Sequence, residues 1–409
     1  MVGGVLGLIV EPLLLRRIYG QEQVLQLLVT FAVFMILEDV QRVVWGAQPY
    51  YVDTALAQLG NVQVGGVHYT AYQLLLLPGV AIAAVADPSR LITTMLGKYT
   101  GVSTYKDFRG VLKGEELDGV LVCTPPAFNP EILEALLERR MPSFVEKPFV
   151  LDAAEGARFA RAFDKAGIIN QVGYVNRWND MFTKARAFVA EGLIGTPLRF
   201  RSEMFSPTII REVADAGWRA SHANGGGAIF EMASHAIDLI AYFFGPPDRV
   251  GGTSLSQVHS RQVEDIVSTG LFYDAGPHAG LTGTLYVNWS DPSYRKPTNK
   301  FEIFGKRGKI QVDQHGMKIY LPEPNEAHGL KAGWNQLYIT DVFSSVDFYV
   351  RGIEYTAQLR DFVAAIREGR PVRCGFADAA ETLRVIEQIF LDHAAQRSAS
   401  AAAKRGAAA

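Results

Sequence analysis

The sequence predicts an α/β domain and an α+β domain: an incomplete Rossmann-type parallel sheet followed by a large, mostly antiparallel open sheet. Over residues 80–172, continuous apolar runs alternate with amphipathic stretches, which is typical of buried parallel strands joined by helices. After residue 197 the apolar period changes to two, as in half-exposed antiparallel strands. The first 79 residues are apolar with few charges, and predict a helical, membrane-like segment.

The individual elements follow from these patterns. Parallel strands are expected at 80–87, 120–126, 143–145 and 168–172, and helices at 88–99, 131–139, 152–166 and 180–191. Antiparallel strands are expected at 198–205, 281–289, 300–304, 309–312 and 317–321, followed by helices at 355–368 and 377–396. Asp152 is the expected N-cap of its helix, because Glu155 three residues later completes a capping box.

Composition limits the function. The chain has 409 residues and a formal net charge of −2, so no nucleic-acid partner is expected. Cys123 and Cys374 are isolated, which excludes a disulfide framework and a zinc site and favours a reducing, cytoplasmic location. No secretory signal is visible at the N-terminus.

The N-terminal region contains three apolar stretches, at 1–15, 24–37 and 72–86, each shorter than the ~20 residues that span a bilayer. They predict either membrane association of residues 1–79 or buried helices of a soluble protein. The run GVLGLIVEPLLLRRIYGQEQVLQLLVTFAVFMILEDVQRVVWG resembles an internal piece of a branched-chain amino acid ABC transporter permease, over residues 3–78. This is far short of a complete permease, so the resemblance does not imply transport.

Two signals follow the first predicted parallel strands. Asp87 ends the strand in AVADPSR, where it can accept hydrogen bonds from an adenosine ribose or cap the following helix. Arg90, three residues later, could instead accommodate a 2′-phosphate. Thr124, Pro125 and Pro126 end the strand VLVCTPP, and would form either a rigid turn over a dinucleotide or an ordinary proline-rich turn.

A third signal is FVEKP, residues 144–148. Lys147 lies at a strand end beside Glu146 and is fixed by Pro148. A lysine near a nicotinamide ring can deprotonate a substrate hydroxyl if burial or a nearby cation lowers its pKa. The alternative is a surface ion pair.

The fourth signal is NGGGAIFEMASHAIDLIAYFFG, residues 224–245, which places Glu231, His235 and Asp238 on one face of a helix. The glycine-rich entry would let the backbone approach a ligand closely. A core histidine satisfied by its neighbours is the alternative. The spacing of Glu231 and His235 also suits half a metal site, but no third ligand is found, so no metal is expected.

In this order the four signals resemble the glucose–fructose oxidoreductase, inositol dehydrogenase and rhizopine catabolism family, Gfo/Idh/MocA, over residues 80–396. Further similar pieces are QVGYVNRW, GLIGTPLRFR, WRA and IFGKRGKIQVD. The resemblance implies that Lys147 and His235 share removal of a hydroxyl proton, oriented by Glu231, where most members carry aspartate. It implies a cofactor site at Asp87, Arg90, Thr124, Pro125, Pro126, Glu146 and Lys147, and a substrate site at Asn176, Arg177, Trp218, Arg219, His235 and Asp238.

The implied activity is NAD(P)-dependent oxidation of a sugar, polyol or related hydroxyl, with NAD favoured over NADP by Asp87. The implied partners are that substrate and further copies of the chain, bound through the open sheet. The divisions expected are the apolar segment 1–79, a truncated dinucleotide-binding domain 80–150, a substrate and oligomerisation domain 151–396, and a disordered tail 397–409.

The glycine-rich G-x-G-x-x-G turn that opens such a domain is missing before Val80. Gly65, Gly66 and His68 are either a decayed trace of it or part of the permease-like sequence. We therefore hypothesise a fusion, natural or artefactual, of a permease fragment with a dehydrogenase that lacks its first βα unit and binds dinucleotide weakly. The alternatives are a membrane-anchored or inactive dehydrogenase-like binding protein, and a non-functional fusion.

Overall fold

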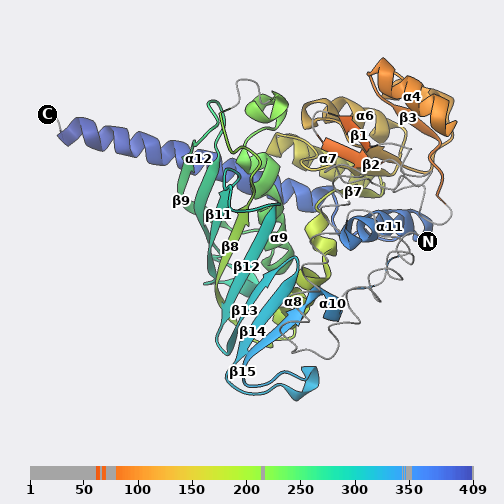
Figure 1. Ribbon diagram of the computed structural model, residues 1–409. Helices are drawn as coiled ribbons and strands as arrows, with labels where there is room; N and C mark the ends of the chain where they lie inside the picture. Colours follow the sequence, from red (N-terminus) through yellow and green to blue (C-terminus); the bar gives the residue numbers. More distant parts are fainter. Residues whose placement is uncertain are drawn as a thin grey trace, which may run out of the picture. The chain divides into compact units, whose positions relative to one another are not determined.

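The computed structural model describes residues 61–64, 67–70, 80–212, 217–342, 344, 346 and 352–407 (Figure 1). Contacts group the chain into two units, 1–58 and 59–409, and every described residue belongs to the second. The predicted apolar helices and almost all of the permease-like sequence therefore lie outside the described residues. No membrane segment is inferred for that region.

The parallel strands form two separate small sheets. One pairs β3 (Ala84–Ala86) with β4 (Ser103–Tyr105), and the other has the order β5 (Val120–Val122), β6 (Ser143–Val145), β7 (Asn170–Val172). The helices between these strands are α4 (Arg90–Thr100), α5 (Phe108–Gly114), α6 (Asn129–Glu138) and α7 (Ala153–Lys165). These elements confirm a Rossmann-like arrangement. β4 and α5 were not predicted, because each is short and contains few apolar residues.

The two small sheets are not joined by a strand in the described part of the chain. In the doubly wound order 3-2-1-4-5-6, the first strand lies between the second and the fourth. Here the chain before β3 instead forms the antiparallel pair β1 (Asn61–Val64) and β2 (Val67–Thr70). His68 lies in β2, while Gly65 and Gly66 fall outside the described residues. The central position of a complete nucleotide-binding sheet is thus not filled by a described strand.

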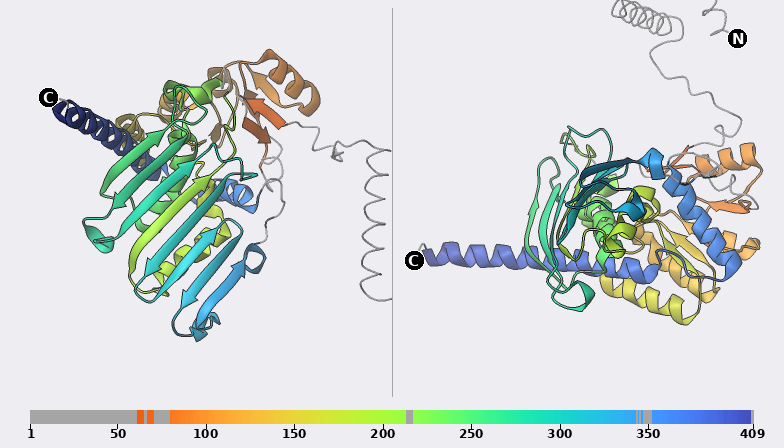
Figure 2. Two further views of the ribbon diagram at one scale, coloured as in Figure 1. Left: turned by 60° about the vertical axis from the view of Figure 1, so that its left-hand side comes forward. Right: turned by 90° about the horizontal axis from the view of Figure 1, so that it is seen from below.

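The second sheet has eight strands in the order β15-β14-β13-β12-β8-β11-β10-β9 (Figure 2). Its strands are β8 (Pro197–Phe205), β9 (Arg249–Ser256), β10 (Ile266–Phe272), β11 (Thr282–Asn288), β12 (Thr298–Gly305), β13 (Gly308–Asp313), β14 (Gly316–Leu321) and β15 (Gly333–Tyr338). Only β8 and β11 pair in parallel, so the predicted mostly antiparallel sheet is confirmed. β9, β10 and β15 were not predicted. β9 is rich in glycine and serine, the apolar alternation of β10 is interrupted by Gly270, and β15 buries neither face fully.

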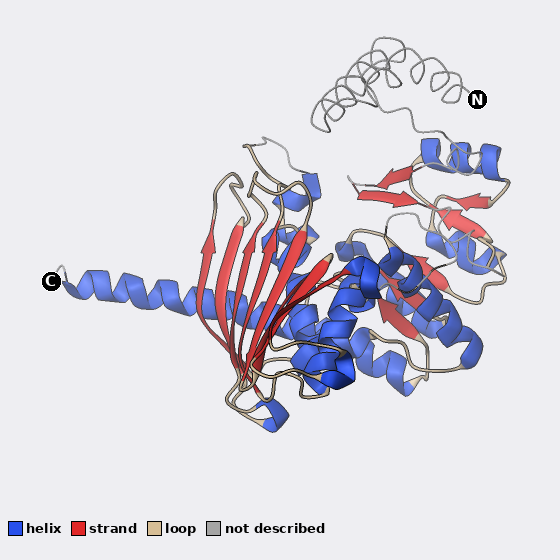
Figure 3. Cartoon of the chain, turned by 60° about the horizontal axis from the view of Figure 1, so that its bottom comes forward, coloured by secondary structure: helices blue, strands red, loops and turns tan. Residues whose placement is uncertain are grey.

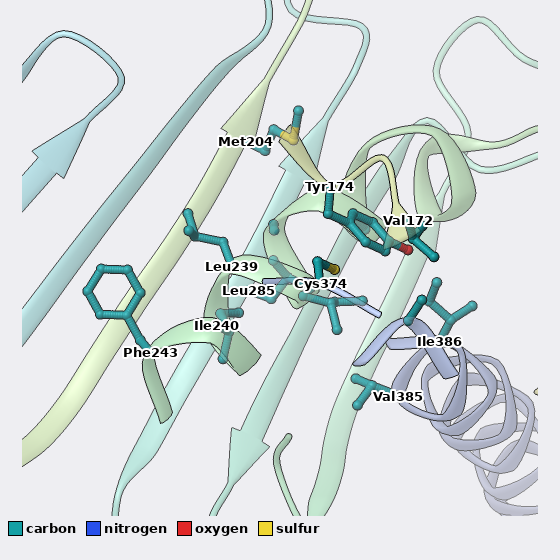
Figure 4. Close-up of a cluster of buried hydrophobic side chains, with 14 of the residues drawn as sticks. Val172, Tyr174, Met204, Leu239, Ile240, Phe243, Leu285, Cys374, Val385 and Ile386 are labelled. Carbon is teal, nitrogen blue, oxygen red and sulfur yellow. The ribbon is translucent and has the colours of Figure 1, made fainter. Parts of the chain in front are cut away.

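Helices cover one face of this sheet (Figure 3). They are α8 (Asp180–Ala190), α9 (Ser234–Phe244) and α12 (Phe376–Ala407), with the short α10 (Ile339–Val342) beside α8. α11 (Ile353–Glu368) instead packs on the three-stranded parallel sheet, where Phe362 meets Phe144 of β6 edge-on. Phe200 of β8 stacks on Phe244 of α9 with ring centroids 5.4 Å apart. Figure 4 shows the core where Tyr174, Leu239, Leu285 and Ile386 from different elements meet.

The segment His222–Phe244 is long and apolar enough to cross a membrane, but 78% of its most apolar window is buried inside the protein. It is therefore a core helix of this domain.

The prediction of a disordered tail is wrong for residues 397–407, because α12 continues to Ala407. This stretch is rich in alanine, which has the highest helix propensity of any residue. Low sequence complexity suggested disorder, whereas the intrinsic preference of the backbone extends the helix.

The close approach of β8 and β11 predicts that Gly283→Ala is destabilising. A Cβ at Gly283 would overlap the ring of Phe200, which is 1% exposed and cannot move into solvent. We expect a loss of about 1–3 kcal/mol in the free energy of unfolding, measured with urea. Gly251→Ala in β9, where the nearest atom is 3.5 Å from the added Cβ, should change it by less than about 1 kcal/mol. Equal effects of the two substitutions would contradict this packing.

Candidate active site

Lys147 links the parallel-sheet domain to the second domain. It follows β6 directly, so it lies at the carboxyl edge of a parallel strand, where ligands bind in open α/β sheets. Its Nζ donates a hydrogen bond of 2.5 Å to the main-chain carbonyl of Glu231. The lysine is therefore not half of a surface ion pair, which was the alternative from sequence.

The carbonyl that binds Lys147 belongs to a π-helical turn, η7 (Ile229–Ala233), which continues into α9. Such turns are rare in α-helices and are frequent at functional sites. The Glu231 side chain points to Arg219, with Oε1 3.4 Å from a guanidinium nitrogen, and both side chains are about one-fifth exposed. The structure thus shows Glu231 paired with Arg219 of η5 (Gly217–Ala220). The family resemblance implied instead that Glu231 orients His235.

His235 begins the next turn, on the same side of the helix. Its ring lies edge-on to Tyr174, with centroids 5.8 Å apart, and its Nδ1 is buried with no hydrogen-bond partner in the described chain. Burial, and then the positive charge of Lys147, hold the pKa of His235 well below its usual range. The imidazole is therefore neutral at neutral pH and can accept a proton. Lys147 binds the carbonyl of Glu231, four residues before His235 in the same helical segment.

Glu146 lies beside this group and carries a perturbed carboxyl. Burial raises the pKa of Glu146 to about 6, opposed by the Lys147 charge and reinforced by Glu231. Gly173 makes room for it, because a Cβ there would lie 2.6 Å from the Glu146 carboxylate. A buried acid with a raised pKa beside a lysine is typical of a catalytic site.

The glycine-rich entry packs closely against other parts of the chain. A Cβ at Gly225 would meet Pro126 at 2.7 Å and Leu151 at 2.9 Å, and one at Gly227 would meet Glu264 at 2.5 Å. The glycines thus allow close packing against the protein itself. This packing attaches the turn before Glu231 to the proline turn after β5.

Arg177 and Asp238 form a buried ion pair. The Arg177 guanidinium donates to both Asp238 oxygens at 2.8–3.1 Å, and the two side chains are 4% and 0% exposed. Arg177 also binds Asp378 at 3.0 Å. Burial raises the pKa of Asp238 to about 6, while Arg177 opposes that shift. These two predicted substrate residues therefore bind each other in the core, and connect η4 (Val175–Trp178) to α9 and α12.

The other predicted site residues lie at the edges of this region. Asp87 accepts the Ser89 N–H at 2.7 Å through one oxygen, in the turn before α4. Thr124 donates to Asn129 at 2.6 Å, and Pro125 and Pro126 lead into α6. Arg90 is exposed at the first turn of α4, and Asn176 is nearly buried in η4. The side chain of Trp218 lies outside the described residues.

Two family models match consecutive parts of this chain. The family model described as "Oxidoreductase family, NAD-binding Rossmann fold" matches residues 59–174, and the model of the GFO/IDH/MocA C-terminal domain matches residues 182–311. Residues 59–311 belong to the Gfo/Idh/MocA oxidoreductase family. It is a family of NAD(P)-dependent dehydrogenases.

Curated relatives and solved structures resemble this Gfo/Idh/MocA chain at low identity. It is 25% identical to the rhizopine catabolism protein MocA of Rhizobium meliloti, over 81% of this chain and 92% of that protein. It is 26% identical to the scyllo-inositol 2-dehydrogenase (NADP(+)) IolW of Bacillus subtilis (strain 168), over 66% of this chain and 74% of that protein. A levoglucosan dehydrogenase in complex with NADH and levoglucosan shares the fold with a TM-score of 0.69 and 20% identity, over 79% of this chain and 92% of that chain.

The start of the family match revises the N-terminal interpretation. The match begins at residue 59, so it includes Gly65, Gly66 and His68 and overlaps the segment compared with a permease. These comparisons give no support to a permease fusion. The three residues lie where the family's nucleotide-binding unit begins.

The buried pair predicts a large loss of stability for Asp238→Ala. The substitution leaves the buried Arg177 cation with the partly exposed Asp378 as a carboxylate partner and the Arg373 carbonyl as an acceptor, which should cost about 3–5 kcal/mol in urea unfolding. The control is Asp274→Ala, which breaks an exposed pair with Arg249 and should cost less than about 1 kcal/mol. Losses of the same size would show that Arg177 does not depend on Asp238.

Proposed function

We propose that this chain oxidises a hydroxyl group of a sugar, polyol or related substrate with NAD or NADP. The observation that carries the proposal is the Lys147 amine bound to the Glu231 carbonyl, one helical turn from a neutral His235. This contact supports a cation and a proton acceptor acting together near the carboxyl end of β6. The relatives named for inositol and levoglucosan dehydrogenation support a polyhydroxylated substrate.

In this proposal the protein positions the substrate hydroxyl and removes its proton. Lys147 would bind the hydroxyl oxygen, and its positive charge stabilises the alkoxide that develops there. His235 would take the proton, since its lowered pKa keeps the imidazole unprotonated at neutral pH. Arg219 and Asn176 are the remaining candidates for binding substrate hydroxyls. We no longer assign Arg177 and Asp238 to the substrate, because they bind each other.

The residues present fit two parts of a dinucleotide. Asp87 uses one carboxylate oxygen for the Ser89 N–H, which leaves the other for an adenosine ribose. Glu146 and Lys147 would lie beside the nicotinamide. Residues 124–126 would lie between the adenosine and nicotinamide ends of the dinucleotide. A bound nicotinamide would supply the hydride chemistry. The described residues include no glycine-rich turn for the pyrophosphate.

Two free thiols fit a reducing cytoplasm, the location that we propose for the enzyme.

Lys147→Ala tests the proposed reaction. We expect kcat/KM to fall by on the order of 10² or more on a panel of inositols, levoglucosan and other polyols, measured as NADH or NADPH formation with millimolar cofactor. Lys165→Ala, at the exposed end of α7, is the matched control and should retain full activity. A wild-type chain inactive on every polyol, or an unaffected Lys147 variant, would refute the proposal.

Cofactor binding tests the weakened nucleotide site. Titration of the full chain should give dissociation constants above the micromolar range, because the sequence before Val80 lacks the G-x-G-x-x-G turn that holds a pyrophosphate. Asp87→Ala should weaken NAD binding more than NADP binding, whereas the exposed Asp164→Ala should change neither. Micromolar binding by the wild type would show that residues 59–79 supply a complete turn.

We also propose that the open sheet joins copies of the chain. Phe304, Tyr320 and Trp334 lie in one cross-strand row and are 41%, 41% and 56% exposed. Lys309 lies between Phe304 and Tyr320 in this row, and Tyr320 meets Trp334 edge-on. Exposed apolar side chains gathered on one face mark protein interfaces.

The row predicts that Trp334→Glu shifts the chain towards monomer in sedimentation velocity, since a charge would be buried at the contact. The exposed Leu391→Glu on α12 is the control and should leave the assembly unchanged. A monomeric wild type would contradict this assignment.

A further inference from the structure

A carboxylate outside all four motifs supports the turn that binds Lys147. Glu264 precedes β10, and its side chain is 4% exposed. One of its oxygens accepts the Ile229 N–H at 2.8 Å, and its main-chain carbonyl accepts the Ala228 N–H at 3.0 Å. The first amides of a helix have no partner within it, so residue 264 supplies the partners of both. A negative charge is also favourable at this end of a helix.

Gly227 shows that the local backbone is adapted to this carboxylate. Its φ of +99° is rarely adopted by residues with a side chain, and an added Cβ would lie 2.5 Å from a Glu264 oxygen. The Gly227 N–H donates to the Arg219 carbonyl at 3.1 Å. The same turn therefore contacts Glu264 on one side and the residue paired with Glu231 on the other.

The second Glu264 oxygen is also held. It lies 3.1 Å from Nε2 of His222, whose ring packs edge-on against Phe390 of α12 with centroids 5.5 Å apart. The carboxylate is thus fixed between His222 and the Ile229 amide. A buried carboxylate held at both oxygens cannot change rotamer without leaving one of these groups unpaired.

We propose that Glu264 is a positioning residue for the Lys147 amine. The Glu264 carboxylate holds the Ile229 amide, and this hydrogen bond holds the π-helical turn in place. The turn in turn presents the Glu231 carbonyl, which accepts a hydrogen bond from the Lys147 amine. The inference rests on the proposed function only in taking Lys147 as a group that binds the reacting hydroxyl. Glu264 itself contacts neither Lys147 nor His235.

The test measures Lys147 in the full chain without requiring turnover. Acetic anhydride labels lysines according to amine accessibility, and mass spectrometry gives the rate at Lys147 relative to the other lysines. Hydrogen–deuterium exchange over residues 226–236 reports the helix start. In Glu264→Ala we expect labelling of Lys147 and exchange of this segment both to rise roughly tenfold. Glu264→Gln retains an acceptor oxygen and should restore both rates towards wild type.

Asp392→Ala controls for a general loss of stability. Asp392 accepts the Thr253 N–H at 2.7 Å and does not contact the glycine turn, so its loss should leave Lys147 labelling unchanged. If Glu264→Ala is not recovered folded, Glu264→Asp, whose reach is one methylene shorter, should change both rates in the same direction. Wild-type rates in a folded Glu264 variant, or an equal rise in Asp392→Ala, would overturn the proposal.

Activity separates this proposal from the proposed function. If the wild type oxidises polyols, Glu264→Ala should lower kcat in parallel with the increase in Lys147 labelling, while KM for NAD stays constant. If the wild type has no activity, the proposed function fails and the labelling still decides the role of Glu264.

Discussion

The hydrogen bond from the Lys147 amine to the Glu231 carbonyl is the contact on which the site depends. It connects the end of a parallel strand to a helix 84 residues later, and thereby unites the two domains at one point. The π-helical turn carries the carbonyl that accepts the amine. Burial, and secondly the Lys147 charge, lower the pKa of His235, so the located lysine also helps to keep the histidine neutral.

Buried polar groups outside the reacting pair form the frame of the site. Arg177 and Asp238 attach α9 to η4 and α12, and Glu264 holds the start of the same helical segment. A site on rigid elements needs such supporting contacts, because small displacements of a proton acceptor greatly reduce its effect. The helix that carries His235 is thus fixed at its beginning and in its second turn.

Sequence alone located the parts of the fold and site that depend on local patterns. Lys147 and His235 stand in short motifs, and the parallel strands are continuous apolar runs. Contacts between residues distant in sequence could not be predicted. Arg177 and Asp238 were assigned to the substrate, because a sequence pattern does not show which charged side chains form ion pairs with each other. Gly227 suggested a ligand, since a glycine required by another side chain and one required by a ligand look the same. Glu264 gave no signal apart from its position beside Asp265 before an apolar strand.

The nucleotide-binding half shows the same limit. The sequence predicted a parallel sheet lacking its first unit, and the structure places β3–β4 and β5–β6–β7 in separate sheets with an antiparallel pair before them. Gly65 and Gly66 lie within the family match, although their spacing is not that of the usual turn. The family assignment therefore rests on the whole pattern, because the most familiar motif is incomplete.

The most direct test of the account is the pKa of His235, measured by NMR of the ¹⁵N-labelled imidazole in the wild type and in Lys147→Met. If the amine and the imidazole share one neighbourhood, the pKa lies well below 6.5 in the wild type and rises when the lysine charge is removed. Lys306→Met, in the turn between β12 and β13, should leave it unchanged. A His235 pKa that does not respond to Lys147 would contradict the convergence of these two side chains.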